Sequence, residues 1–130
     1  MRTEKDSLGE WTLSDDILYG INTARAIENF RLEYKRVDQA LIYALVQVKR
    51  AAAVTYRKLG VGKPEVYDAL VRACDVVLSG AADDSFVTEA LQGGAGTSTN
   101  MNANEVLANL AFASLAALWA NTKRFIRSTT

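Results

Sequence analysis

The part of the sequence best suited to chemistry is a loop rich in glycine and hydroxyl residues, QGGAGTSTNMN at positions 92–102. Three glycines in four residues let backbone N–H groups approach a ligand closely and adopt positive φ values. Three hydroxyl residues follow at Thr97, Ser98 and Thr99, and we predict that a helix begins near Asn100. N–H groups, hydroxyls and a helix N-terminus together form an uncharged cradle that suits a carboxylate or phosphate oxygen.

Two familiar glycine motifs do not fit this loop. A P-loop places Lys and then Ser or Thr after its last glycine, whereas Thr97 follows Gly96 here. A dinucleotide-binding fingerprint needs a preceding strand and a further glycine where Thr99 stands. A plain turn with Thr99 or Asn100 as a helix cap is the alternative interpretation. The loop holds no ionisable side chain, and Glu105 lies one turn into the helix, so we expect anion binding without a complete acid–base apparatus.

Composition narrows the class of protein further. The 130 residues carry 15 basic and 15 acidic side chains, so the net charge of zero removes the electrostatic case for nucleic-acid binding and leaves self-association open. The chain has no histidine and a single cysteine, Cys74, which excludes histidine metal sites and internal disulfides. The first ten residues are polar and the most apolar stretch, 106–120, is too short for a bilayer. We therefore expect a soluble, cytoplasmic domain with no membrane partner.

Helices must position the loop. Apolar residues recur every three or four positions over 36–59, which predicts a long helix ended by Gly60. A second helix is predicted from Pro64 to about Ser79, with Cys74 as an inert packing residue on its apolar stripe. The predicted buried stripe of the first helix comprises Val37, Leu41, Leu45, Val48, Ala52, Thr55 and Leu59.

The sequence patterns before residue 36 and after residue 79 are less regular than those of the two central helices. Residues 1–34 are turn-rich: we expect a short helix capped by Ser14 and stopped by Gly20, then at most two helical turns over 24–30. Residues 80–99 are predicted to form a loop anchored by Phe86 and Leu91. The last predicted helix runs from about Asn100 to 119 and is apolar on nearly every side, so it requires more partners than this chain supplies.

The sequence GGAGTSTNMNANEVLAN (93–109) resembles the first signature of the aspartase/fumarase superfamily. Three further segments agree with it, RTEKDSLGE (2–10), YGINTARAIENF (19–30) and VKRAAA (48–53), and the match extends in register from about residue 2 to 110. The resemblance implies a mainly α fold: the N-terminal (cap) domain of an aspartase/fumarase-like homotetramer. It would comprise an irregular N-terminal segment, which admits a small hairpin, and about three principal helices.

The resemblance also implies a reaction. Class II fumarases typically have Ser where this chain has Ala95, so the loop is closest to the aspartate ammonia-lyase branch, which converts L-aspartate to fumarate and ammonia by β-elimination. In that reading Thr97 donates its hydroxyl to a substrate carboxylate, with contacts from Gly96 and Ser98. Asn100 and Asn102 either orient the loop or begin the helix. Arg25 either attracts the dicarboxylate or forms a packing ion pair, and no cofactor or metal is expected.

The match departs from the family near the end of the chain. Family members are several times longer and carry their catalytic serine on a later mobile loop, so we assign no catalytic residue to this chain and expect it to be inactive alone. We expect residues 1–116 to form the N-terminal domain and 117–130 a divergent tail. Codons for 121–130 exist that encode a family-like His-Pro-Leu-Asp-Asp string in another frame, so a frameshift before Asn121 is one hypothesis. A truncation and a natural short paralogue are the others.

Two alternative functions remain open. One is a class II fumarase-like reaction, from malate to fumarate and water. The other is a non-catalytic helical oligomerisation module, in which the glycine loop is only a turn and the last helix is a self-association surface. The expected partners are a small dicarboxylate and further copies of the chain.

Overall fold

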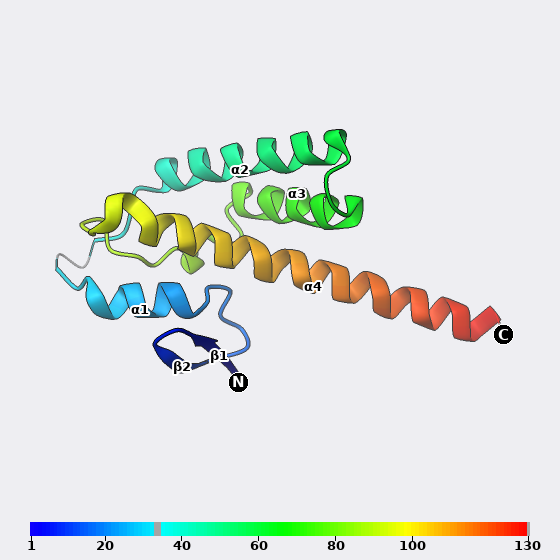
Figure 1. Cartoon of the computed structure of the whole chain (residues 1–130), viewed down its shortest axis with the longest axis horizontal. Helices are drawn as coiled ribbons and strands as arrows, with labels where there is room; N and C mark the ends of the chain where they lie inside the picture. The colour runs from blue at the N-terminus through cyan, green and yellow to red at the C-terminus, as the bar shows by residue number, and fades with distance from the viewer. Residues whose placement is uncertain (33–34, 130) are drawn as a thin grey trace.

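The computed structural model describes residues 1–32 and 35–129, with side chains placed as far as residue 118 and at residue 120. Four helices and a two-stranded sheet make up the described chain. Figure 1 shows α4 as the longest element, with α2 and α3 stacked on one side of it and α1 and the hairpin on the other. This arrangement confirms the predicted mainly α architecture.

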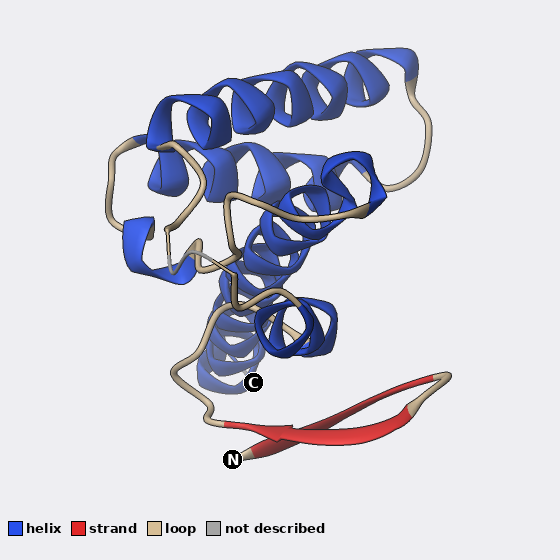
Figure 2. Ribbon diagram, turned by 90° about the vertical axis from the view of Figure 1, so that its left-hand side faces the viewer, coloured by secondary structure: helices blue, strands red, loops and turns tan. Residues whose placement is uncertain are grey.

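The N-terminal segment is a β-hairpin, as the sequence allowed. Strand β1 (Arg2–Asp6) pairs antiparallel with β2 (Gly9–Leu13), in a register that places Arg2 opposite Leu13 and Asp6 opposite Gly9. The turn is closed by the Leu8 N–H, which donates to Asp6 Oδ1 at 2.9 Å. Figure 2 shows that the hairpin lies apart from the helical layer, with α1 between it and α4.

Helix α1 spans Ile21–Asn29, and Gly20 is its N-cap residue. This corrects the expectation that Gly20 ends a preceding helix. Residues 15–16 form only a turn, and no helix starts at Ser14. Gly20 is required for a different reason: a Cβ there would collide with the Glu105 carboxylate and lie 2.8 Å from Glu4 Oε1. These two carboxylates take the place of a capping side chain at the start of α1.

Helices α2 (Gln39–Leu59) and α3 (Pro64–Leu78) begin and end close to the predicted positions. The Asp38 side chain caps α2 by accepting from the Ala40 N–H at 2.8 Å, and Gly60 ends it with φ +68°. Pro64 occupies the first turn of α3 and Ser79 is its last capping residue. Local start and stop signals therefore delimit this helical pair.

The buried face of α2 was predicted only in part: Leu45 of the predicted stripe packs against the core. Its buried residues are Ile42, Val46 and Ala53, whereas Leu41, Val48 and Leu59 are 59%, 68% and 69% exposed. Both stripes are apolar and adjacent on the helix, so periodicity does not distinguish them. The packing of α3 against α2 determines which of the two stripes is buried. The buried residues of α3 are Ala69, Ala73, Cys74 and Val77.

Helix α4 (Thr97–Thr129) begins three residues earlier and ends ten residues later than predicted, so most of the proposed tail continues it as helix. Residue 130 lies outside the described residues. Phe112 is 69% exposed, which agrees with the expectation that this helix has too few partners. Its buried side chains complete the core with α2 and α3: Ala103, Val106, Leu107, Ala111 and Leu115.

The segment between α3 and α4 contains two short 3₁₀ turns, Asp83–Ser85 and Gly94–Gly96, within the predicted loop. Phe86 is 3% exposed and anchors the segment in the core, as expected. Leu91 is 52% exposed and is not an anchor, contrary to the prediction. Among the described residues, no helix is both long and apolar enough to cross a bilayer.

Candidate anion-binding site at the start of α4

The glycine loop enters α4 through three consecutive residues with positive φ. Gly94 and Gly96 have φ values of +73° and +83°, and Ala95 between them has φ +54° and ψ +36°. A left-handed conformation costs a non-glycine residue about 1–2 kcal/mol. A Cβ at Gly96 would meet nothing within 4 Å, so this glycine serves the backbone conformation and not a close approach. The loop thus presents a tightly turned, exposed backbone at the helix N-terminus.

Thr97 is exposed, and its hydroxyl oxygen lies 2.6 Å from the Gly94 carbonyl oxygen, to which it donates. The hydroxyl has one hydrogen, so it can donate to a ligand only after it releases Gly94. Rotation of the Thr97 side chain would provide that change. The structure therefore places the predicted ligand residue at the surface, in an orientation that closes the turn.

The three hydroxyls of the loop do not share one environment. Thr99 is buried at 9% exposure, and its N–H and hydroxyl lie 3.0 and 3.1 Å from Gln92 Oε1. Gln92 Nε2 in turn donates to the Glu89 carbonyl at 2.6 Å. Thr99 therefore stabilises the loop through Gln92. Thr97 and the half-buried Ser98 carry the hydroxyls that lie nearer to solvent. Gln92 is a capping residue that the sequence interpretation missed.

The two asparagines of the motif make structural contacts. Asn102 is 1% exposed; its Oδ1 accepts from the Val87 N–H at 3.0 Å and its Nδ2 donates to the Ser85 carbonyl at 2.9 Å. Asn100 Oδ1 accepts from Lys49 Nζ at 2.7 Å. Asn102 thus holds the segment before the loop, and Asn100 joins α4 to α2.

Arg25 is engaged with the hairpin. Its guanidinium forms a two-point ion pair with Asp6, at 2.7 and 2.9 Å, and lies 5.3 Å from the centre of the Trp11 ring. Hydrogen bonding from Arg25 holds the pKa of Asp6 below its usual value. None of these contacts involves the glycine loop, so the structure gives Arg25 the geometry of a packing ion pair and does not bring it to the other predicted site residues.

Glu105 is a further residue whose role the sequence did not reveal. Its Oε1 accepts from the N–H and hydroxyl of Thr23 at 2.9 and 2.7 Å, and its Oε2 accepts from the Asn22 N–H at 3.1 Å. Glu4 Oε1 accepts from the Ile21 N–H at 3.0 Å. Carboxylates are favoured at a helix N-terminus by the helix dipole. Glu105 therefore joins α1 to α4, two turns after the loop.

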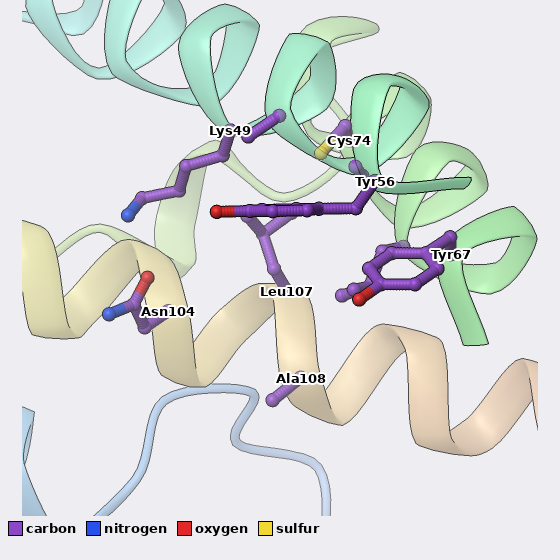
Figure 3. Close-up of a pocket in the computed structure, with 10 residues that line it drawn as sticks. Lys49, Tyr56, Tyr67, Cys74, Asn104, Leu107 and Ala108 are labelled. Carbon is purple, nitrogen blue, oxygen red and sulfur yellow. The ribbon is translucent and has the colours of Figure 1, made fainter. Parts of the chain in front are cut away.

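A groove between α2, α3 and α4 has none of the loop residues 92–102 in its lining. Figure 3 shows Lys49, Tyr56, Tyr67, Leu107 and Ala108 around it. Cys74 also lines the groove, yet it is only 1% exposed, and burial raises the pKa of its thiol. This environment agrees with the prediction of an unreactive packing cysteine.

The loop brings together an exposed turn of glycine backbone, the exposed Thr97 hydroxyl and the positive end of a helix dipole, with no ionisable side chain over residues 93–98. The N–H groups of Thr97 and Thr99 already donate within the loop, to the Gly94 carbonyl and to Gln92 Oε1. Such neutral donors stabilise an anion or a negative charge that develops during a reaction. They do not remove a proton from carbon. In chemical terms, such a turn suits an anion such as a carboxylate.

A family model described as "Lyase" matches residues 9–127 of the chain. Among curated proteins, the aspartate ammonia-lyase of Bacillus sp is 46% identical over 111 residues, which cover 85% of this chain and 24% of that protein. The class II fumarate hydratase of Halobacterium salinarum is 48% identical over 110 residues, covering 85% and 23%. The chain thus spans about a quarter of the length of the curated relatives it matches.

Solved structures give the same result. The native fumarate lyase:delta crystallin structure from Brucella melitensis superposes with a TM-score of 0.85 at 47% identity, covering 89% of this chain and 27% of that one. The class II fumarase of Schistosoma mansoni superposes with a TM-score of 0.80 at 38% identity, covering 85% and 23%. The similarity therefore includes the path of the backbone as well as the sequence.

Proposed function

We propose, because the chain belongs to the aspartase/fumarase superfamily of lyases, that it is the N-terminal part of an enzyme that eliminates ammonia from L-aspartate. In this reaction a base removes a proton from the carbon beside one carboxylate, and that carboxylate gains negative charge before ammonia leaves. The glycine loop would hold this carboxylate through the Thr97 hydroxyl and the backbone N–H groups of the turn. The observation that carries the proposal is the exposed, positive-φ turn ending at Thr97 on the N-terminus of α4.

The order of events follows from the chemistry of the loop. In the free chain the Thr97 hydroxyl donates to the Gly94 carbonyl. A carboxylate is a stronger acceptor than a neutral carbonyl, so substrate entry would turn this hydroxyl toward the ligand. Once turned, this neutral hydroxyl would stabilise the developing dianion without adding a formal charge.

The preference for aspartate over malate rests on a single residue type. Ala95 occupies the position at which the class II fumarases typically have Ser, and it keeps a left-handed conformation there. The fumarase-like reaction is the second candidate, and the 48% identity to the Halobacterium salinarum fumarate hydratase favours it. Both reactions produce fumarate, so the same loop would serve either.

We further propose that the 130-residue chain has no lyase turnover alone. We also propose that the whole enzyme is a cytoplasmic homotetramer, and that residues 1–116 belong to its N-terminal domain and 117–130 to a tail. The loop has no base, and Arg25 is taken by Asp6. A chain that spans a quarter of its relatives would hold one part of an active site. Fumarate absorbance that rises in proportion to the concentration of the pure chain would contradict this proposal.

A pair of chimeric enzymes tests the reaction. Residues 9–110 of this chain would replace the matching segment of the Bacillus sp aspartate ammonia-lyase and, separately, of the Halobacterium salinarum fumarate hydratase. We expect the first chimera to keep the larger fraction of its recipient's activity. A larger retained fraction in the second would favour the fumarase-like reaction, and loss of activity in two folded chimeras would contradict both.

The Thr97→Val variant of the active chimera tests the role of the hydroxyl. Removing a single donor to a developing negative charge typically lowers kcat about 10²–10³-fold. Thr12→Val, at an exposed hairpin position, is the matched control and should leave kcat unchanged. If both variants retain full kcat, the loop is a structural turn, as the oligomerisation-module alternative requires.

A further inference from the structure

The groove between α2, α3 and α4 has properties that the proposed reaction does not use. Its volume is about 430 Å³, within the range of about 300–1,000 Å³ that is usual for small-molecule sites. The walls are mostly apolar and include Ala52, Leu70 and Leu107. Tyr56 and Tyr67 close one end, with ring centres 6.0 Å apart. Figure 3 shows Tyr56 lying flat beside Leu107, so the aromatic ring forms a wall of the groove.

Lys49 is the one charged residue among the ten that line this groove. Its side chain extends from α2 toward α4, and its ammonium group donates to Asn100 Oδ1 at 2.7 Å. Asn100 is a neutral amide, so this bond does not neutralise the charge. The next basic residue of α2, Arg50, does have a carboxylate partner, Asp75, at 2.8 Å. Over the part of the chain that the structure describes, no carboxylate forms an ion pair with Lys49.

The position of Lys49 makes an anionic partner favourable. Partial burial lowers the pKa of its ammonium group, because the charged form loses solvation in the groove. A ligand anion would restore favourable interactions to this charge. Since the walls beyond Lys49 are mostly apolar, the rest of the ligand would gain by burying apolar surface.

We propose that this groove binds small amphipathic monocarboxylates, with the carboxylate on Lys49 Nζ and an apolar chain or ring lying between α2 and α4 toward Tyr56 and Tyr67. A dicarboxylate fits poorly, because the apolar end offers no second cation. The groove therefore selects a ligand of different chemistry from the one proposed for the glycine loop. This inference does not depend on the proposed lyase reaction.

Titration of the 130-residue chain with octanoate, followed by NMR of alanine methyl and backbone amide groups, tests the proposal. Octanoate should shift the signals of Ala52, Ala53 and Ala108 saturably. Octanol keeps the apolar chain without the charge, and we expect it to bind about tenfold more weakly, in line with the loss of one charge-assisted hydrogen bond. Acetate and succinate should not shift these three signals at the same concentration.

Two variants, each with a matched control, separate the contribution of the Lys49 charge to octanoate binding from that of the shape of the groove. Lys49→Met should remove the preference for octanoate over octanol, whereas Lys58→Met, on the same helix but outside the groove lining, should keep it. Ala108→Phe places a ring in the groove from an exposed position and should abolish octanoate binding. Ala113→Phe, an exposed alanine of α4 outside the lining, should not. Circular dichroism confirms that each variant is folded.

Three results would overturn the proposal. The first is equal binding of octanoate and octanol to the unaltered chain, which would show that Lys49 does not select an anion. The second is the absence of saturable shifts at the groove, or shifts confined to residues 93–98. The third is a groove occupied by a second copy of the chain, seen as groove signals that change on dilution and sedimentation as a dimer, with no response to octanoate.

Discussion

The carboxylate of Glu105 should be a major determinant of stability, because it receives three hydrogen bonds from the start of α1. Thr23 is fully buried, and both its N–H and its hydroxyl donate to Glu105 Oε1. Replacing Glu105 by Ala leaves these two buried donors without a partner, at about 1–3 kcal/mol each when water cannot enter. With partial access of water beside the half-buried carboxylate, we expect a loss of about 2–4 kcal/mol in the free energy of unfolding.

The Glu105→Gln variant gives an intermediate result. Its amide oxygen can still accept from Thr23, but its NH₂ group faces the Asn22 N–H, and the negative charge at the helix N-terminus is lost. We expect a loss of about 1–2 kcal/mol. This variant keeps the test informative if Glu105→Ala does not fold.

Urea unfolding followed by circular dichroism measures both effects. With a denaturant slope of about 2 kcal/mol per M, a loss of 3 kcal/mol lowers the midpoint by about 1.5 M. Glu28→Ala, at an exposed position of α1, is the control and should change stability by less than about 0.5 kcal/mol. If Glu105→Ala unfolds at the same urea concentration as this control, the inferred role of Glu105 is wrong.

Three further outcomes follow from the structure. Gly20→Ala should destabilise the chain by about 1–3 kcal/mol in urea unfolding, because its Cβ would collide with Glu105; a neutral result would contradict the close approach. The hydrogen bond from Tyr43 to Asp83, 2.7 Å long, raises the pKa of Tyr43, so its stabilising contribution is present below about pH 10 and is lost as the pH rises through the raised value. A spectrophotometric titration should show a tyrosine that ionises above the usual pKa of about 10, and Asp83→Asn should remove this step. Burial also raises the pKa of Cys74, so iodoacetamide should modify it much more slowly in the native chain than in urea, and equal rates would show that the thiol is accessible.

Sequence patterns predicted the elements that depend on neighbouring residues. Gly60 and Pro64 delimit the turn between α2 and α3 as expected, because each favours its backbone conformation without help from the rest of the chain. The hydrophobic anchor Phe86 was also correct. The two helix boundaries are short-range effects, because the residues that cause them lie within a few positions. The burial of Phe86 was predictable from its large apolar side chain alone.

Features that depend on distant contacts were predicted poorly. The buried face of α2 depends on α3, and two adjacent apolar stripes gave no means of choosing between Leu41 and Ile42. The role of Gly20 depends on Glu105, which is far away in the sequence. In the candidate site, the loop and its exposed Thr97 were found from residue types. The cap formed by Gln92 was missed because it requires the three-dimensional path of the loop.

The carboxylate bridge from α4 to α1 also has a consequence during synthesis on the ribosome. Thr23 and Glu105 are 82 positions apart, and Asn109 Nδ2 reaches the Leu18 carbonyl from 91 positions away. At a translation rate of about 5–20 residues per second, roughly 4–16 seconds pass between the addition of Thr23 and that of Glu105. The hairpin and α1 therefore leave the exit tunnel before the α4 residues that they contact have been synthesised, and a nascent chain should expose them to chaperones and proteases throughout that interval.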